Sequence, residues 1–244
     1  MKKYIFPVIL TAIFSAALIL HLKYRVYSAG DDEKYESSRI EMAEYQLKNR
    51  GISDKRVLNA MIKVPRHEFV PDDLKASAYI DGALPIGYGQ TISQPYIVAL
   101  MTELLKLNNS SRVLEVGTGS GYQAAVLAEI VKEVYTVEIV KALHEKSDKV
   151  LKRLGYKNIK TMNGDGYYGW KEHAQYDAII VTCASEFIPP PLISQLNNGG
   201  IMCIPVGPPF KVQHLLLVKK IKPGEVITSL ITEVRFVPLL RKGD

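Results

Sequence analysis

From residue 112 onward, short apolar runs alternate with longer segments whose apolar residues recur at helical spacing. Strands are predicted for the runs at 112–117, 133–138, 158–163, 176–182 and 199–207, and helices for the segments at 122–131, 140–154 and 190–196. Strands that are joined through helices lie parallel in one sheet. The order therefore predicts an α/β protein with a doubly wound, mostly parallel sheet.

Two further strands and an N-terminal helical part complete the expected fold. The runs at 213–220 and 226–234 flank a Pro-Gly turn and are typical of a hairpin, which would add an antiparallel edge to the sheet. Ahead of the sheet, residues 37–50 have helical character and predict an N-terminal helical extension. Residues 84–94 contain several glycine and polar breaks and are predicted to form a loop before a helix at 95–107.

The composition agrees with a packed α/β protein and excludes several other classes. Of the 244 residues, 47% are hydrophobic and 23% are charged, so disorder is not expected. The net charge of +6 is spread along the chain without a dense basic run, which argues against a nucleic-acid partner. Cys183 and Cys203 lie in apolar runs and are interpreted as buried, reduced thiols. Neither the cysteines nor the histidines have a ligand spacing, so no metal site is expected.

The N-terminal residues 1–28 differ from the rest of the chain. Two lysines precede an apolar run whose length lies between that of a secretory signal core and that of a full membrane span. A cleaved signal peptide, an uncleaved anchor and an extension without a targeting role all remain open. Residues 29–36 are polar and are interpreted as a linker, so the folded domain is expected at 37–244.

A glycine-rich turn follows the first strand of the alternating region. Residues 115–121 read Glu-Val-Gly-Thr-Gly-Ser-Gly and open the next helix. The third glycine falls one place earlier than in the dinucleotide fingerprint, where Tyr122 stands instead. Glu115 would repel a pyrophosphate but would attract the α-amino group of a methionine moiety. The turn therefore favours S-adenosylmethionine over a nicotinamide dinucleotide, with cofactor contacts expected from Glu115, Gly117, Thr118, Gly119 and Gly121.

The next two strands also end near acidic residues. Glu138 ends the second strand, where an acid can accept hydrogen bonds from both ribose hydroxyls, and Ile139 adjoins it. Asp165 follows the third strand and is expected to accept from the exocyclic amine of adenine, with Gly166 allowing the ring to come close. The carboxyl ends of parallel strands meet at one edge of a sheet, so these residues predict a single cofactor site.

Several segments resemble the protein-L-isoaspartate O-methyltransferase family, and together they extend over about residues 53–240. They are LPIGYGQTISQPYIVALMTELL (84–105), RVLEVGTGSGYQAAVLAEI (112–130), GDGYYGW (164–170), YDAIIVT (176–182), QLNNGGIMCIPVG (195–207) and EVRFVPL (233–239). The glycine turn is shared with many methyltransferases, whereas QTISQP and the Arg-Phe-Val-Pro sequence are more specific to this family.

The resemblance implies both a fold and an activity. The fold would be Rossmann-like, with a doubly wound, mostly parallel seven-stranded methyltransferase sheet, helices on both faces and an antiparallel edge. The activity would be that of a protein-L-isoaspartate (D-aspartate) O-methyltransferase. Such an enzyme transfers methyl from S-adenosyl-L-methionine to the free α-carboxylate of L-isoaspartyl residues in damaged proteins and initiates their repair to L-aspartyl.

By position, the resemblance assigns Ser93 as the active-site serine and places Gln90, Thr91 and Ile92 beside the cofactor. A carboxylate acceptor is already nucleophilic at neutral pH, so Ser93 is interpreted as a hydrogen-bond donor that orients it. The alternative is that Ser93 only caps the helix that begins at Pro95. The family's C-terminal segment, here residues 237–239, packs near the site. The chain departs from the family at residues 183–186, where Cys-Ala-Ser-Glu replaces the usual Ala-Ala-Pro.

The resemblance also bears on partners and location. Isoaspartyl-containing proteins and peptides are the expected partners, nucleic acid is not, and a monomer is expected. S-adenosylmethionine is made in the cytosol, so the catalytic domain is expected in the cytoplasm, and a membrane tether through residues 4–22 remains open. Two alternatives are a methyltransferase that acts on another acceptor and a membrane-tethered module that binds S-adenosylmethionine without turnover.

Overall fold

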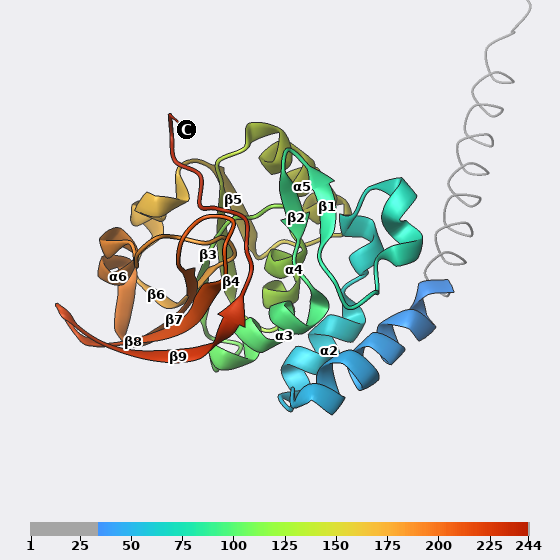
Figure 1. Ribbon diagram of the computed structural model, residues 1–244, viewed down its shortest axis with the longest axis horizontal. Helices are drawn as coiled ribbons and strands as arrows, with labels where there is room; N and C mark the ends of the chain where they lie inside the picture. Colours follow the sequence, from blue (N-terminus) through green and yellow to red (C-terminus); the bar gives the residue numbers. More distant parts are fainter. Residues whose placement is uncertain (1–33, 244) are drawn as a thin grey trace, which may run out of the picture.

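The computed structural model describes residues 34–243 and contains the expected sheet (Figure 1). Within these residues, the seven-stranded sheet has the order β5-β4-β3-β6-β7-β8-β9. Its strands are β3 (Arg112–Val116), β4 (Glu133–Glu138), β5 (Ile159–Asn163), β6 (Tyr176–Val181), β7 (Leu196–Val206), β8 (Gln213–Lys222) and β9 (Glu225–Val234). The strands from β5 to β7 pair in parallel, and β8 and β9 add the antiparallel edge. The predicted fold class is confirmed.

The order of the strands places a switch point beside β3. The chain runs outward from β3 through β4 to β5, and then returns to place β6 on the other side of β3. In open α/β sheets, a crevice forms at such a point, outside the carboxyl ends of the strands. The residues that follow β3, β4 and β6 are therefore the ones that this topology brings together.

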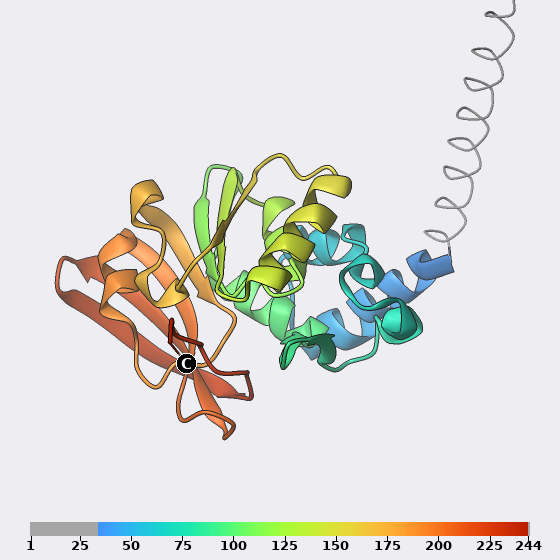
Figure 2. The same ribbon diagram turned by 90° about the horizontal axis from the view of Figure 1, so that it is seen from above.

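Helices cover both faces of the sheet because side chains alternate along each strand. Val113 of β3 points into a core on one face, whereas Leu114 and Val116 point into a core on the other. The first core includes helices α2 (Lys55–Lys63), α3 (Pro95–Leu104), α4 (Tyr122–Ala128) and α5 (Lys141–Arg153), and the second includes α6 (Pro190–Gln195). Figure 2 shows the yellow helix α5 beside the strands of the sheet, where it packs on β4 and β5.

The N-terminal part is helical, as predicted. Residues 34–41 form an α-helix that continues through the π-helix η1 (Met42–Leu47) and the 3-10 helix η2 (Lys48–Arg50). Residues 34–36, at the end of the segment expected to be a linker, already belong to this helix. Two further 3-10 helices, η3 (Arg66–Phe69) and η4 (Asp72–Ser77), lead toward the sheet. The apolar segment 1–28, with the tether left open at 4–22, lies outside the described residues. Within residues 34–243, no helix has the length and hydropathy needed to cross a membrane.

The prediction of a loop at 84–94 is wrong, because this segment forms a hairpin. Strands β1 (Leu84–Gly87) and β2 (Gln90–Ile92) pair antiparallel around a two-residue turn. Tyr88 and Gly89 both have positive φ, of 55° and 69°, as a tight turn of this kind requires. The alternating Leu84, Ile86 and Ile92 are all buried. The hairpin therefore packs one apolar face on the protein and carries Gln90 and Thr91 toward the switch point.

Candidate active site

A crevice of about 700 Å³, including the open space at its mouth, lies at the switch point. It is bounded by the end of the hairpin, the turns after β3 and β4, the start of the 3-10 helix η5 (Gly166–Tyr168), the loop after β6 and the C-terminal segment. Among the expected site residues, those that line it are Gln90, Thr91, Ile92, Ser93, Glu115, Gly117, Thr118, Gly119, Glu138, Ile139 and Gly166. Gly121 and Asp165 do not line it. Within residues 34–243, no group of three or more potential ligands could hold a metal ion.

Glu115 lies fully buried at the crevice. One carboxylate oxygen accepts a hydrogen bond from the hydroxyl of Thr136 at 2.5 Å, and the other has no hydrogen-bond partner among the described residues. Burial raises the pKa of Glu115 to about 8, and the nearby carboxylate of Glu138 acts in the same direction. A buried carboxylate with an unused oxygen is suited to a cation, and the α-ammonium group of S-adenosylmethionine is one that fits.

Threonines connect Glu115 to the glycine turn. The hydroxyl of Thr118 lies 2.6 Å from that of Thr136, which in turn donates to Glu115. All three side chains are buried. The chain of hydrogen bonds fixes the orientation of the Glu115 carboxyl group, because each hydroxyl can donate one proton and accept another.

Gly117 must be glycine for two reasons. Its φ is +98°, and an added β-carbon would lie 2.6 Å from the hydroxyl oxygen of Thr182. That hydroxyl donates to the carbonyl oxygen of Gly117 at 2.6 Å, so the loop after β6 holds the turn after β3. Gly121 has a packing role. It has a φ of +89° at the N-terminus of α4, and an added β-carbon would lie 3.3 Å from Leu151 of α5. Gly121 therefore permits close packing of the two helices.

Glu138 joins the turns after β3 and β4. One of its oxygens accepts from the backbone N–H of Gly119 at 2.8 Å, and the other accepts from that of Val140 at 2.9 Å. The side chain is buried and lines the crevice. Each carboxylate oxygen can accept a second hydrogen bond, so the capacity to bind two hydroxyl groups remains.

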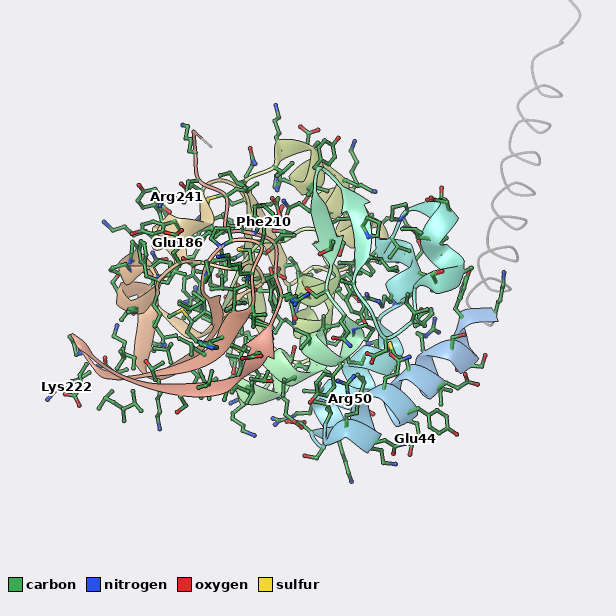
Figure 3. The ribbon with its side chains drawn as sticks, viewed as in Figure 1. Glu44, Arg50, Glu186, Phe210, Lys222 and Arg241 are labelled. Carbon is green, nitrogen blue, oxygen red and sulfur yellow. The ribbon has the colours of Figure 1, made fainter. Side chains whose placement is uncertain are left out.

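Asp165 fastens the C-terminal segment. One oxygen accepts from the backbone N–H of Tyr167, and the other lies 3.0 Å from Nε of Arg241 and accepts from the backbone N–H of Lys242. The guanidinium of Arg241 also lies 3.7 Å from the ring centroid of Tyr167. Figure 3 labels Arg241 close to the C-terminal end of the chain. The geometry thus directs Asp165 toward the protein's own C-terminal segment.

The C-terminal segment closes one side of the crevice. Residues 237–240 line it, as the resemblance implied for 237–239. The backbone N–H of Ala184 donates to the carbonyl of Val237 at 2.8 Å, and that of Leu239 donates to the carbonyl of Ala184 at 2.7 Å. The departure at 183–186 therefore lies in the loop that holds this segment. Cys183 is a free, buried thiol at the crevice, and burial raises its pKa well above the usual range.

Ser93 stands at a boundary between two cavities. A second cavity, of about 1090 Å³ with its open mouth included, shares Thr91, Ser93 and Thr182 with the crevice. The alternative that Ser93 caps α3 is wrong, because Gln94 occupies the N-cap position. The hydroxyl of Ser93 makes no hydrogen bond with any residue in 34–243, so its donor is free for a ligand. Its backbone carbonyl accepts from Arg66 at 2.8 Å.

Sequence reasoning missed Thr182, Arg66 and most of the second cavity. Thr182 ends an apolar run, and nothing in its neighbours indicates that its hydroxyl reaches the turn after β3. Arg66 lies far from every predicted site residue in the sequence. Two residues of the second cavity, Arg235 and Phe236, belong to the Arg-Phe-Val-Pro sequence, which is the one signal that pointed to this region.

Comparisons with known proteins point to one family. The family model for protein-L-isoaspartate(D-aspartate) O-methyltransferase (PCMT) matches residues 38–244. Protein-L-isoaspartate O-methyltransferase 2 of Shewanella sediminis is 56% identical over 86% of this chain and 86% of its own. The enzyme of the same name from Syntrophobacter fumaroxidans is 52% identical over 94% and 96%.

Solved structures give the same result. A protein-L-isoaspartate O-methyltransferase structure is 32% identical, with a TM-score of 0.74 over 82% of this chain and 65% of its own. A Plasmodium falciparum structure, described as a putative protein-L-isoaspartate O-methyltransferase in complex with S-adenosyl-L-homocysteine, is 30% identical. Its TM-score is 0.72 over 83% of this chain and 98% of its own.

Proposed function

Because the chain belongs to the protein-L-isoaspartate(D-aspartate) O-methyltransferase family, we propose how its residues share the work of that family's reaction. The protein is an S-adenosylmethionine-dependent enzyme that methylates the free α-carboxylate of L-isoaspartyl residues in damaged proteins. One observation supports the proposal. Thr91, Ser93 and Thr182 line both the crevice and the second cavity, so they form the wall between the two.

The crevice is the cofactor side of this wall. Glu115, with its unused buried oxygen, binds the α-ammonium group. Glu138 accepts from the ribose hydroxyls, and Ile139 and Gly166 line the space for the adenine. When bound there, S-adenosylmethionine supplies a methyl group on a positively charged sulfur. The chain's contribution on this side is to fix the position of that sulfur through residues that hydrogen bonds already hold in place.

The second cavity is the acceptor side. An isoaspartyl residue continues the main chain through its side-chain carboxyl group, so its α-carboxylate is free to enter. Ser93 lines both cavities and donates a hydrogen bond to one oxygen of that carboxylate, which orients the other oxygen toward the methyl group. A bond then forms between this oxygen and the methyl carbon as the bond from carbon to sulfur breaks. No general base is needed, because the acceptor is ionised at neutral pH.

Exclusion of water assists the transfer. An anion and a cation are both neutralised as the methyl group moves, so a site of low polarity favours the products over the separated charges. The C-terminal segment at 237–240 and the buried thiol of Cys183 line the crevice. The product is a methyl ester, which the neighbouring backbone amide nitrogen attacks with loss of methanol to give a succinimide. Hydrolysis of the succinimide yields L-aspartyl in part, so repair begins with this enzyme.

Arg235 supplies positive charge at the acceptor side. It is an exposed cation on the lining of the second cavity, and no ion pair with a carboxylate of residues 34–243 involves it. The other charged residues of the lining are Asp81 and Glu233. Asp81 is already paired with Arg50 at 2.8 Å. Arg235 therefore attracts the acceptor carboxylate before methylation, and it has no such attraction for the neutral ester.

We also propose the partners and the location of the protein. Isoaspartyl-containing proteins and peptides are the substrates, nucleic acid is not a partner, and the unit that acts is a monomer formed by residues 37–244. This domain lies in the cytoplasm, where S-adenosylmethionine is made. Protease protection in intact and opened cells tests the location, because digestion in intact cells would place the domain outside.

One assay tests the function. The purified protein is incubated with tritiated S-adenosylmethionine and either an isoaspartyl peptide or its aspartyl twin. We expect base-labile label on the isoaspartyl peptide alone, since only that peptide presents a free α-carboxylate within the chain. Equal labelling of both peptides would indicate another acceptor. Binding of adenosylhomocysteine without labelling of either peptide would indicate a module without turnover on this substrate.

A further inference from the structure

Arg66 is fully buried and contacts the segment between β2 and α3 that contains Ser93. It belongs to the 3-10 helix η3, outside the crevice and the second cavity. Burial lowers the pKa of Arg66 to about 10, so its guanidinium stays charged at neutral pH. No carboxylate of residues 34–243 forms an ion pair with it. A buried charge without a counter-ion is costly. The presence of arginine here calls for a specific explanation.

The guanidinium joins the two ends of one segment. Nε donates to the carbonyl of Ala78 at 2.7 Å, and Nη2 donates to the carbonyl of Ser93 at 2.8 Å. Ala78 is the C-cap of η4, and Ser93 directly follows β2. The whole hairpin β1–β2 lies between these two carbonyls. Arg66 therefore closes the base of the hairpin whose last residues line the crevice.

The same side chain also contacts the cofactor side. Its Cζ lies 4.8 Å from the ring centroid of Tyr122, which is fully buried and lines the crevice at the start of α4. The rigid, planar guanidinium of Arg66 thus contacts both Tyr122, which follows the glycine turn, and Ser93, which faces the acceptor. A guanidinium holds its donors in a fixed fork, whereas lysine offers a single point charge on a flexible stem.

We infer that Arg66 is a positioning residue for methyl transfer, which holds the Ser93 carbonyl so that the Ser93 hydroxyl stays at the wall between the two cavities. The inference rests on the proposed role of Ser93. Transfer in line between two bound groups is sensitive to small misplacements, and displacement by about 1 Å can lower a rate on the order of 100-fold. Arg66 acts through Ser93 and touches neither reactant.

A double-mutant cycle tests this inference. Arg66→Lys, Ser93→Ala and the double variant are compared with the wild type for kcat, measured per site that binds adenosylhomocysteine in calorimetry. Counting binding sites removes any effect of partly unfolded protein. Arg66→Gln is made as a second variant in case the lysine variant does not fold. Arg56→Lys is the matched control, because Arg56 is an exposed arginine that pairs with Asp54 away from the crevice.

We expect Arg66→Lys to lower kcat on the isoaspartyl peptide about tenfold, with the Kd of adenosylhomocysteine changed by less than about threefold. In the Ser93→Ala background the same substitution has little further effect, because non-additivity marks residues that act together. Equal losses of kcat in both backgrounds, or a normal kcat for Arg66→Lys, would overturn the inference while leaving the proposed function intact. Loss of adenosylhomocysteine binding by both Arg66 variants would show a structural role and overturn it too. A wild type that does not methylate the isoaspartyl peptide would refute the proposed function itself.

Discussion

Glu115 is expected to release a proton when the crevice takes up adenosylhomocysteine. Its carboxyl group is fully buried, with one oxygen unused, and burial raises its pKa to about 8. Relative to the ordinary value of 4.5, this pKa means that the anion is destabilised by roughly 5 kcal/mol. At pH 7 such a group is protonated in about 90% of molecules. The α-ammonium group of the ligand favours the ionised carboxylate, so binding displaces that proton.

The number of protons released on binding depends on pH. Glu115 releases about 0.9 proton per site at pH 7 and about half a proton at pH 8. Affinity for adenosylhomocysteine therefore rises about tenfold from pH 6 to pH 7 through Glu115, and it levels off above pH 8. Isothermal titration calorimetry in phosphate and in Tris at the same pH measures the released proton, because the two buffers have different enthalpies of ionisation.

Glu115→Gln is the matched control for this measurement. The amide keeps the size of the side chain but cannot release a proton, so its binding enthalpy should not depend on the buffer. Its affinity should fall at least about tenfold, since the charge pair with the ammonium group is lost. A wild-type enthalpy that is independent of the buffer at pH 7 would refute the reasoning. The same buffer dependence in Glu115→Gln would assign the proton to another group.

Three further predictions concern Glu115, Ser93 and Arg235. Because the folded-state pKa of Glu115 is raised, the folded protein keeps a proton that the unfolded chain loses as the pH rises. The unliganded protein should therefore lose about 2.5 kcal/mol of stability between pH 5 and pH 7 through this group. Urea unfolding of Glu115→Gln should lack that loss. Ser93→Ala should lower kcat about tenfold or more with the Kd of adenosylhomocysteine little changed, and near-normal turnover of the purified variant would reject its orienting role. Arg235→Gln should raise KM for the isoaspartyl peptide about two- to fivefold, the effect of losing an exposed ion pair, and should make KM less dependent on salt. An unchanged KM at low salt would contradict the proposed attraction between Arg235 and the acceptor carboxylate.

The sheet could be predicted from the sequence because its signals are local. The apolar run at 176–182 and the turn at Pro223-Gly224 are features of a few consecutive residues, and β6 and the β8–β9 hairpin follow from them. The hairpin β1–β2 could not be found in this way. Its strands are only four and three residues long, and Tyr88, which is not a typical residue for positive φ, occupies half of its turn.

The candidate site was predictable where it depends on the ends of consecutive strands. The turn after β3 and the residues Glu138 and Gly166 come together because the topology places them at one edge. Asp165 stands at the same edge for the same topological reason, and its pairing with the distant Arg241 was not predictable. Arg66 likewise owes its place to tertiary packing. Such pairings join residues far apart in the chain, and no local pattern encodes them.

A crystal structure with adenosylhomocysteine and an isoaspartyl peptide bound together tests the meeting of the two cavities most directly. We expect the sulfur of the cofactor product in the crevice and the isoaspartyl α-carboxylate in the second cavity, within hydrogen-bonding distance of the Ser93 hydroxyl and facing that sulfur. A peptide carboxylate that reaches the sulfur from another side, with Thr91, Ser93 and Thr182 not touching it, would contradict the account.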